Sequence, residues 1–209
     1  QARTQLTARM SEHAPNKLQR SLMRLDEAPA FMRGFVRNII LRRAVPFTGT
    51  AGVQFVSLTP ERVEVRLANE HRVRNHIGSV HASAMNLLAE TATGMAVGMN
   101  VRDDCLPLAK ELSMAFKKRA TGALKAVATL TAEQRAAMQA SDKGEVQVKV
   151  TVTDETGVEP VECAFTWAWV PSSRPAKNCR SFTMAKRAQD AYIVAATRTP
   201  IGRSHRGFF

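Results

Sequence analysis

The chain has 209 residues, of which 44% are hydrophobic and 23% charged, and its formal net charge is +12. This length and composition indicate a globular protein with one domain and an appendage, and the absence of any run of 18 apolar residues argues against a membrane-spanning helix. The three cysteines are scattered without a CxxC pair, which argues against structural zinc or a disulfide framework. With no apolar core typical of a secretory signal near the N-terminus, we expect a cytoplasmic protein.

The positive charge is concentrated near the C-terminus. Residues 171–209 contain eight basic residues and one acidic residue, so this basic tail carries more than half of the net charge. The tail contains no RNA- or DNA-binding motif, and we therefore expect no specific nucleic-acid partner. The mildly basic remainder suits an anionic ligand.

Two helices are expected near the N-terminus, after a flexible segment at residues 1–15. Leucines at helical spacing follow Asn16, and Pro29 is suited to open the second helix. The second helix should carry one apolar side, made of Phe31, Met32, Phe35, Val36, Ile39 and Ile40. It also carries four arginines: Arg33, Arg37, Arg42 and Arg43. These arginines indicate either a solvated face, which we favour, or a phosphate-binding surface.

After Pro46 the spacing of apolar residues changes from 3.6 to 2, which is typical of strands. The predicted strands are 53–58, 61–68, 108–117, 122–130, 145–153 and 161–169. A short helix should begin at Thr131, because Thr131 and Gln134 have the spacing of a capping box. The last two strands should form a hairpin with its turn at residues 154–157.

The longest helix is expected within residues 75–98. From Met85 to Met99 the apolar residues fall on every side of a 3.6-residue helix, so we expect it to be buried all round. Glu90 interrupts this pattern, and it should be hydrogen-bonded, raised in pKa, or facing a cavity. Six strands and one buried helix predict an α+β domain at residues 16–170, with an antiparallel sheet wrapped around the central helix and the N-terminal helices added.

Four residues follow one another at spacings of three, three and nine: Asn75, Gly78, His81 and Glu90. This pattern resembles the signature of hotdog-fold acyl-CoA thioesterases of the phenylacetate-degradation type and their uncharacterised relatives. The chain has Ala82-Ser83 where that family usually has two glycines. The resemblance implies hydrolysis of an acyl-CoA to a carboxylic acid and coenzyme A, with no further cofactor and no metal.

Helical geometry constrains such a site. Nine residues at 100° each turn His81 and Glu90 to opposite sides of one regular helix. Either His81 precedes the helix, or the site combines the loop of one subunit with the helix of another. The resemblance implies the second arrangement, a homodimer or homotetramer with its acyl-CoA sites across the dimer interface.

Candidate roles follow from what thioester hydrolysis requires. Glu90 would act as the base or nucleophile, and the alternative is a buried acid hydrogen-bonded to Asn86 or Thr93. Asn75 would position the water or the carbonyl, or form a turn. His81 would orient the carbonyl or hold the loop.

The remaining candidates would bind the substrate. Gly78 is expected to adopt a positive φ, and backbone N–H groups around Ala82 and Ser83 are candidate oxyanion donors. Ser83 is predicted to be the N-cap of the helix and not a nucleophile, because no GxSxG motif surrounds it. The basic cluster of Lys117, Lys118 and Arg119 would bind the phosphates of coenzyme A or form a solvated strand end.

A non-catalytic acyl-CoA or acyl-lipid binding module on the same fold is the alternative function. Residues 184–209 resemble the N-terminus of a bacterial thiolase, the acetyl-CoA acyltransferase. Thiolase activity is not implied, because this segment contains none of the catalytic residues of that enzyme. The resemblance associates the chain with acyl-CoA metabolism.

Overall fold

The computed structural model describes residues 14–27 and 29–172. The expectations for residues 1–13 and for the thiolase-like segment lie outside the described residues. The elements in chain order are α2 (Lys17–Asp26), α3 (Ala30–Ala44), α4 (Pro46–Ala51), β1 (Gln54–Leu58), β2 (Arg62–Leu67), the 3-10 helix η1 (His71–Val73), α5 (Ala82–Asn100), β3 (Cys105–Phe116), β4 (Leu124–Thr129), α6 (Ala132–Ala140), β5 (Gly144–Asp154) and β6 (Val161–Pro171).

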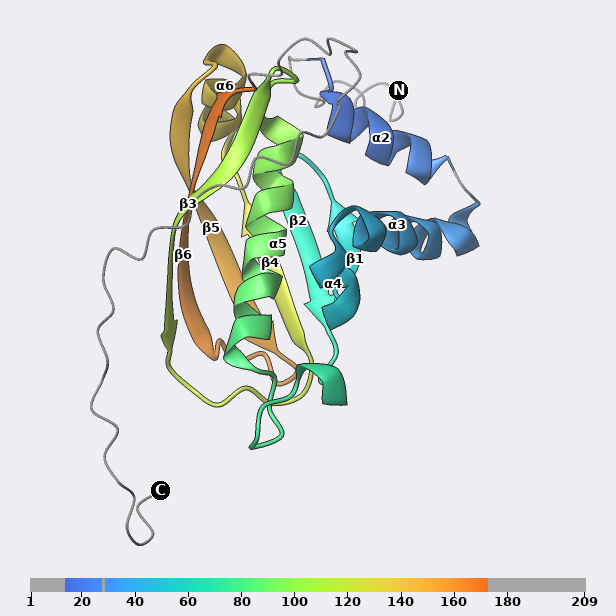
Figure 1. Ribbon diagram of the computed structural model, residues 1–209, viewed down its shortest axis with the longest axis vertical. Helices are drawn as coiled ribbons and strands as arrows, with labels where there is room; N and C mark the ends of the chain where they lie inside the picture. Colours follow the sequence, from blue (N-terminus) through green and yellow to red (C-terminus); the bar gives the residue numbers. More distant parts are fainter. Residues whose placement is uncertain (1–13, 28, 173–209) are drawn as a thin grey trace, which may run out of the picture. The chain divides into compact units, whose positions relative to one another are not determined.

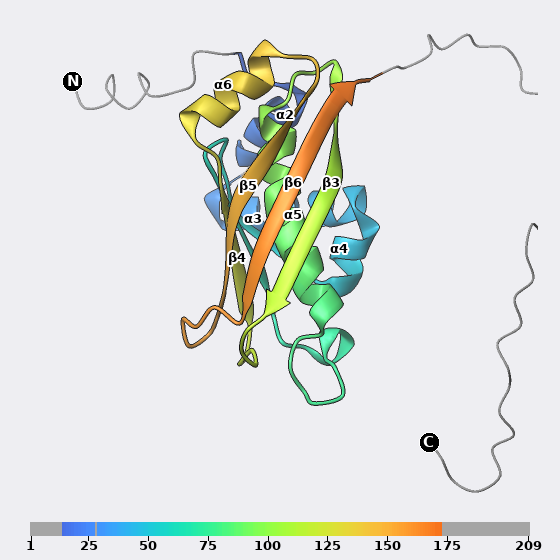
Figure 2. The same cartoon turned by 90° about the vertical axis from the view of Figure 1, so that its left-hand side faces the viewer.

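The six strands form one antiparallel sheet in the order β1-β2-β4-β5-β6-β3. Both predicted hairpins are present, because β1 pairs with β2 and β5 pairs with β6. Alternate residues face the core, as expected for strands of period 2, and on β5 the buried apolar ones are Val146, Val148, Val150 and Val152. Strands β1 and β3 form the two edges of the sheet, and Figure 2 shows β3 beside β6.

Helix α5 runs along one face of the sheet and contacts β2, β3, β4, β5 and β6 (Figure 1). Leu88, Ala92 and Ala96 of this helix are fully buried against the sheet. The predicted α+β class, with a sheet wrapped around a central helix and helices added at the N-terminus, is confirmed. The expectation that α5 is buried all round is wrong, because the side that carries Asn86 and Glu90 is only half-buried.

Local sequence signals fix several of these elements. The capping box of Thr131 and Gln134 is present at the start of α6. Asn16 caps α2 by accepting from the N–H of Gln19, and its amide donates to the carbonyls of Gly98 and Val101 at the end of α5. One side chain therefore begins α2 and also fastens it to the central helix.

Helix α3 forms where the sequence predicts it, but it turns its polar side toward the sheet. Arg37 donates to the carbonyls of Phe55 and Val56 on edge strand β1, and Asn38 exchanges hydrogen bonds with the backbone of Phe55. Arg42 donates to the carbonyl of Val53 at 2.7 Å. These contacts satisfy backbone groups of an edge strand, so neither the solvated nor the phosphate-binding interpretation holds for these two arginines.

Candidate functional site

The loop that leads into α5 is fixed by its own polar side chains. The Oδ1 atom of Asn75 accepts hydrogen bonds from the N–H groups of Ile77 and Ser79, both at 3.1 Å. Arg119 donates to the Ile77 carbonyl at 2.7 Å and to the Ser79 hydroxyl at 3.1 Å. Gly78 adopts the predicted positive φ, 77°, which closes the turn. Asn75 and Arg119 thus hold the shape of this loop.

Helix α5 begins at Ala82, two residues before the start at Ala84 that a Ser83 cap would give, so the prediction of Ser83 as N-cap is wrong. His81 is the N-cap: its backbone is extended, and its Nδ1 atom accepts from the N–H of Ser83 at 3.1 Å. The Ser83 N–H is therefore already hydrogen-bonded to His81, unlike a free oxyanion donor. The Ala82 N–H, at the first helical position, has no acceptor within the helix.

A small cavity of about 160 Å³ lies at this end of α5. It brings together four of the predicted residues: Asn75, Ala82, Lys118 and Arg119. Its wall also includes apolar side chains such as Met85 and Phe116. Lys117 lies elsewhere, because its ammonium group pairs with Glu162 at 3.0 Å on the strand end.

Glu90 lines a second, larger cavity of about 370 Å³ in the middle of α5. The other lining residues are mainly apolar: Leu18, Leu41, Ala44, Val45, Thr48, Phe55, Leu87, Thr91, Gly94, Met95 and Trp167. No hydrogen bond or ion pair joins the Glu90 carboxylate to another residue in the described ranges. The Thr93 hydroxyl donates to the backbone carbonyls of Ala89 and Glu90 and not to the Glu90 carboxylate. The expected cavity-facing acid is therefore present, and the alternative of a carboxylate bonded to Asn86 or Thr93 is not.

Trp167 of β6 forms part of the wall of this cavity and is held in place by two neighbours. Its indole N–H donates to the Thr93 hydroxyl at 3.0 Å. A Cβ atom at Gly94 would lie 2.8 Å from Cη2 of the ring, so the glycine provides the space that the indole occupies. The alternation of β6 predicts that Trp167 faces inward, but sequence analysis did not identify it as part of the site.

Asn86, which sequence analysis considered only as a partner for Glu90, is not among the residues that line either cavity. It lies one turn before Glu90 on the same side of α5, and its Oδ1 atom is buried without a hydrogen-bond partner. Buried polar atoms are seldom left unpaired, and this oxygen is an exception that neither the fold nor a cavity satisfies. No spacing rule would have distinguished it from any other helical Asn.

One chain does not bring the predicted residues into one site. Ala82 and Glu90 are eight residues apart on a single helix, which separates them by about 12 Å along its axis. The two cavities share no lining residue. The small cavity at the start of α5, which we term the helix entrance, and the Glu90 cavity are therefore two distinct surfaces of each chain.

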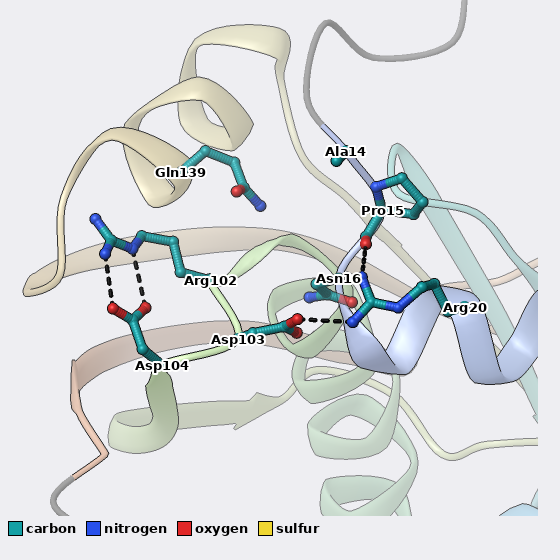
Figure 3. Close-up of a pocket in the computed structure, with 8 residues that line it drawn as sticks. All are labelled: Ala14, Pro15, Asn16, Arg20, Arg102, Asp103, Asp104 and Gln139. Carbon is teal, nitrogen blue, oxygen red and sulfur yellow. Dashed lines mark hydrogen bonds and ion pairs between the residues drawn. The ribbon is translucent and has the colours of Figure 1, made fainter.

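A third cavity, of about 300 Å³, lies where the N-terminal helix meets the end of α5 (Figure 3). Its charged side chains are paired with each other: Arg20 with Asp103 at 2.8 Å, and Arg102 with Asp104 at 2.6 Å. The first pair fastens α2 to the loop before β3, the second lies within that loop, and together they leave no unpaired charge on these four side chains for a ligand.

Two further properties concern the described residues as a whole. No group of three or more His, Cys, Asp or Glu side chains within residues 14–27 and 29–172 is placed to hold a metal ion. No helix of that part of the chain combines the length and the apolar character needed to cross a bilayer.

Comparison with known proteins gives a family and a fold. A family model described as "Domain of unknown function (DUF4442)" matches residues 36–170. No curated protein matches the chain. A protein of unknown function from Pseudomonas aeruginosa, described as a probable thioesterase, has a similar structure, with 25% identity, a TM-score of 0.60, and coverage of 65% of this chain and 94% of that one.

Two further solved structures share the fold at lower identity. A thioesterase from Haemophilus influenzae is 14% identical, with a TM-score of 0.50 over 61% of this chain and 85% of that one. A mutant thioesterase from Staphylococcus aureus is 16% identical, with a TM-score of 0.51 over 61% of this chain and all of the other. Together with the sheet order, these structures identify the fold as the hotdog fold.

Proposed function

Because the chain belongs to the DUF4442 family and has the hotdog fold of the thioesterases it resembles, we propose that it hydrolyses an acyl thioester. The products would be a carboxylic acid and a free thiol, with coenzyme A as the thiol carrier. One observation carries the proposal: Glu90 is an unpaired carboxylate in the wall of an apolar cavity large enough for an acyl chain.

The cavity supports hydrolysis because it combines an apolar slot with one base. A water molecule would attack the thioester carbonyl carbon while the Glu90 carboxylate accepts its proton, and the C–S bond would then break to release the thiolate. The thiolate would take up a proton to give the free thiol.

The entrance of α5 would stabilise the other part of the substrate. The Ala82 N–H points from a helix N-terminus, where developing negative charge on a thioester oxygen is favoured. Lys118 and Arg119 line the same small cavity and add positive charge for the phosphates of coenzyme A. With the roles divided in this way, the helix entrance and the Glu90 cavity must both contact the same substrate molecule.

A second copy of the chain would bring the two surfaces together. Edge strand β3 has no neighbour on its outer side among the described strands, and it exposes Leu106, Leu108, Leu112 and Phe116. An open, apolar edge strand is a template for pairing with another chain. We therefore propose a homodimer joined at β3, in which the helix entrance of one subunit faces the Glu90 cavity of the other.

The first experiment measures thiol release from short-chain, long-chain and aryl acyl-CoA thioesters by wild type and Glu90→Gln, together with binding of a non-hydrolysable analogue. Turnover that is lost in the variant while the analogue still binds would support Glu90 as the base. Tight binding without turnover by wild type would favour the alternative, a non-catalytic acyl-CoA binding module.

Mixing two inactive variants tests the shared site. Glu90→Gln removes the base from the Glu90 cavity, and Asn75→Ala disturbs the loop at the start of α5. A mixed dimer still contains one site in which the intact loop of one subunit faces the intact Glu90 cavity of the other. Random exchange of subunits should then restore about one quarter of wild-type turnover. No recovery, in a mixture shown to exchange subunits, would place the whole site within one chain.

A further inference from the structure

The Glu90 cavity follows one side of α5 and ends at α2. Leu87, Glu90 and Gly94 line it from successive turns of α5. The next position on that side is Gly98, where a Cβ atom would lie 3.2 Å from the Cδ2 atom of Leu18 in α2. Because Leu18 also lines the cavity, its side chain closes the cavity at the end toward the C-terminus of α5.

Leu18 is held in place by hydrogen bonds of the two residues before it. The Asn16 amide donates to the Val101 carbonyl at 2.7 Å, and the Lys17 N–H donates to the Asp103 carboxylate at 2.6 Å. These bonds fasten the first turn of α2 to the end of α5 and to the loop after it (Figure 1). Leu18 itself is half-buried and packs against the core. It is therefore a fixed end wall of the cavity.

The dimensions of the cavity indicate the length of the chain that it accepts. At roughly 30 Å³ for each group the size of a water molecule or a methylene, its volume of about 370 Å³ has room for about twelve such groups. Glu90 and Gly98 are eight residues apart, so about 12 Å of helix lies between the carboxylate and the end wall. Because the thioester group and the attacking water occupy the space beside Glu90, the remaining space fits an acyl chain of about eight to ten carbons.

The wall of the cavity offers no polar partner to the far end of such a chain. Glu90 is the only charged residue among the described residues that line it. The hydroxyls of Thr48 and Thr91 donate to backbone carbonyls one turn earlier, at 2.7 and 2.6 Å, and the Trp167 indole N–H donates to Thr93. A chain that ends in a hydroxyl, amine or carboxylate would lose its hydration there without gaining a partner, so the cavity favours an unsubstituted alkyl chain.

We propose that the Glu90 cavity takes an unsubstituted acyl chain of about eight to ten carbons, and that Leu18 is the specificity-determining residue that sets this upper limit. That the chain arrives as a thioester rests on the proposed function. The limit on chain length does not, because it follows from the shape of the cavity and applies equally to a ligand that is bound without being hydrolysed.

The test measures dissociation constants of the full chain for non-hydrolysable alkyl thioethers of coenzyme A, from butyl to hexadecyl, by titration calorimetry. Each added methylene that enters the cavity should tighten binding about fourfold. For wild type this gain should end near the decyl compound, because a longer chain meets Leu18.

Three variants locate the end wall. Leu18→Ala should move the limit to chains about two carbons longer and tighten binding of the dodecyl compound about tenfold, whereas Leu18→Phe should move the limit to shorter chains. Leu22→Ala is the matched control, because it makes the same change at a buried leucine of α2 that does not line the cavity. It should lower the melting temperature and leave the dependence on chain length unchanged, and thermal melts verify that each variant folds.

The same dependence on chain length in wild type, Leu18→Ala and Leu18→Phe would overturn the proposal. So would affinity that rises through the hexadecyl compound in wild type, no binding of any thioether, or an equal shift in Leu22→Ala. Thiol release from the matching acyl-CoA thioesters separates this inference from the proposed function. A length limit in binding without any release would reject hydrolysis alone, and release that Leu18 does not influence would reject only the role of Leu18.

Discussion

The loop before α5 and the middle of α5 both carry polar side chains, but the two regions use them differently. In the loop, Asn75, Ser79 and Arg119 are joined by hydrogen bonds within the chain. In the middle of the helix, Asn86 has a buried unpaired oxygen and Glu90 faces a cavity. The difference separates groups that hold the fold from a carboxylate, that of Glu90, which remains available to a ligand.

The same contrast explains why a motif alone does not assign roles. Asn75, Gly78 and His81 form a turn and a helix cap, and each makes contacts that any such turn would need. Glu90 makes no such contact. A half-buried carboxylate that faces a cavity and is bonded to no other described residue is the stronger candidate for chemistry.

The largest effect is expected at Glu90. Glu90→Gln keeps the shape of the side chain but removes the base, so thioester turnover should fall by about 10²–10⁴-fold. Because the carboxylate has no partner among the described residues, the free energy of unfolding should change by no more than about 0.5 kcal/mol. Urea unfolding beside the thiol-release assay checks both, and a large loss of stability would contradict the assignment.

Gly94→Ala should damage the wall of the cavity. The added methyl group meets the Trp167 ring, which the Thr93 hydroxyl holds in place, so the variant should lose about 1–3 kcal/mol of stability. Gly98→Ala is the matched control on the same helix, because its methyl group meets only the end of the Leu18 side chain, at 3.2 Å. Similar melting temperatures for the two variants would show that the ring moves freely.

Asp154→Asn makes the same change as Glu90→Gln at an acid that holds the fold. Asp154 accepts hydrogen bonds from the hydroxyl and N–H of Thr156 and from the N–H groups of Thr121 and Val158. An amide group there would turn a donor toward one of these donors, which should cost about 1–3 kcal/mol and leave turnover per folded molecule unchanged.

This acid also gives a pH dependence with a defined sign. The hydrogen bond from the Thr156 hydroxyl, aided by the backbone N–H groups, lowers the pKa of Asp154 in the folded state. Its contribution to stability is therefore complete above the unfolded-state pKa of about 3.9 and is lost as the pH falls through the lower folded-state value. Wild type should lose stability more steeply than Asp154→Asn below about pH 4, and parallel curves would contradict this.

A smaller effect is expected at Asn86. Asn86→Leu removes a buried oxygen that has no partner, so stability should stay equal or rise by up to about 1 kcal/mol. Turnover should stay close to that of wild type, because Asn86 lines neither cavity. A destabilised variant, or one with clearly reduced turnover, would contradict this expectation.

Much of the fold could be read from local patterns. The period-2 alternation gave the strands, and the spacing of Thr131 and Gln134 gave the start of α6. The cap of α5 could not be obtained this way, because Ser83 has the residue type that N-caps prefer, and only the conformation of the preceding loop places His81 at that position instead. The identity of the capping residue depends on the path of the loop before the helix, and this path is set by tertiary contacts.

The sequence by itself determined that a long apolar helix carries one acid and that six strands surround it, because periodicity and composition are properties of the chain. Only the tertiary structure decided which sides of the helices are covered. The sheet covers one side of α5 and leaves Glu90 at a cavity, and the edge of β1 takes the polar side of α3 and leaves Phe31 and Phe35 outward. Burial depends on neighbours that are distant in sequence, and periodicity within one helix does not specify them.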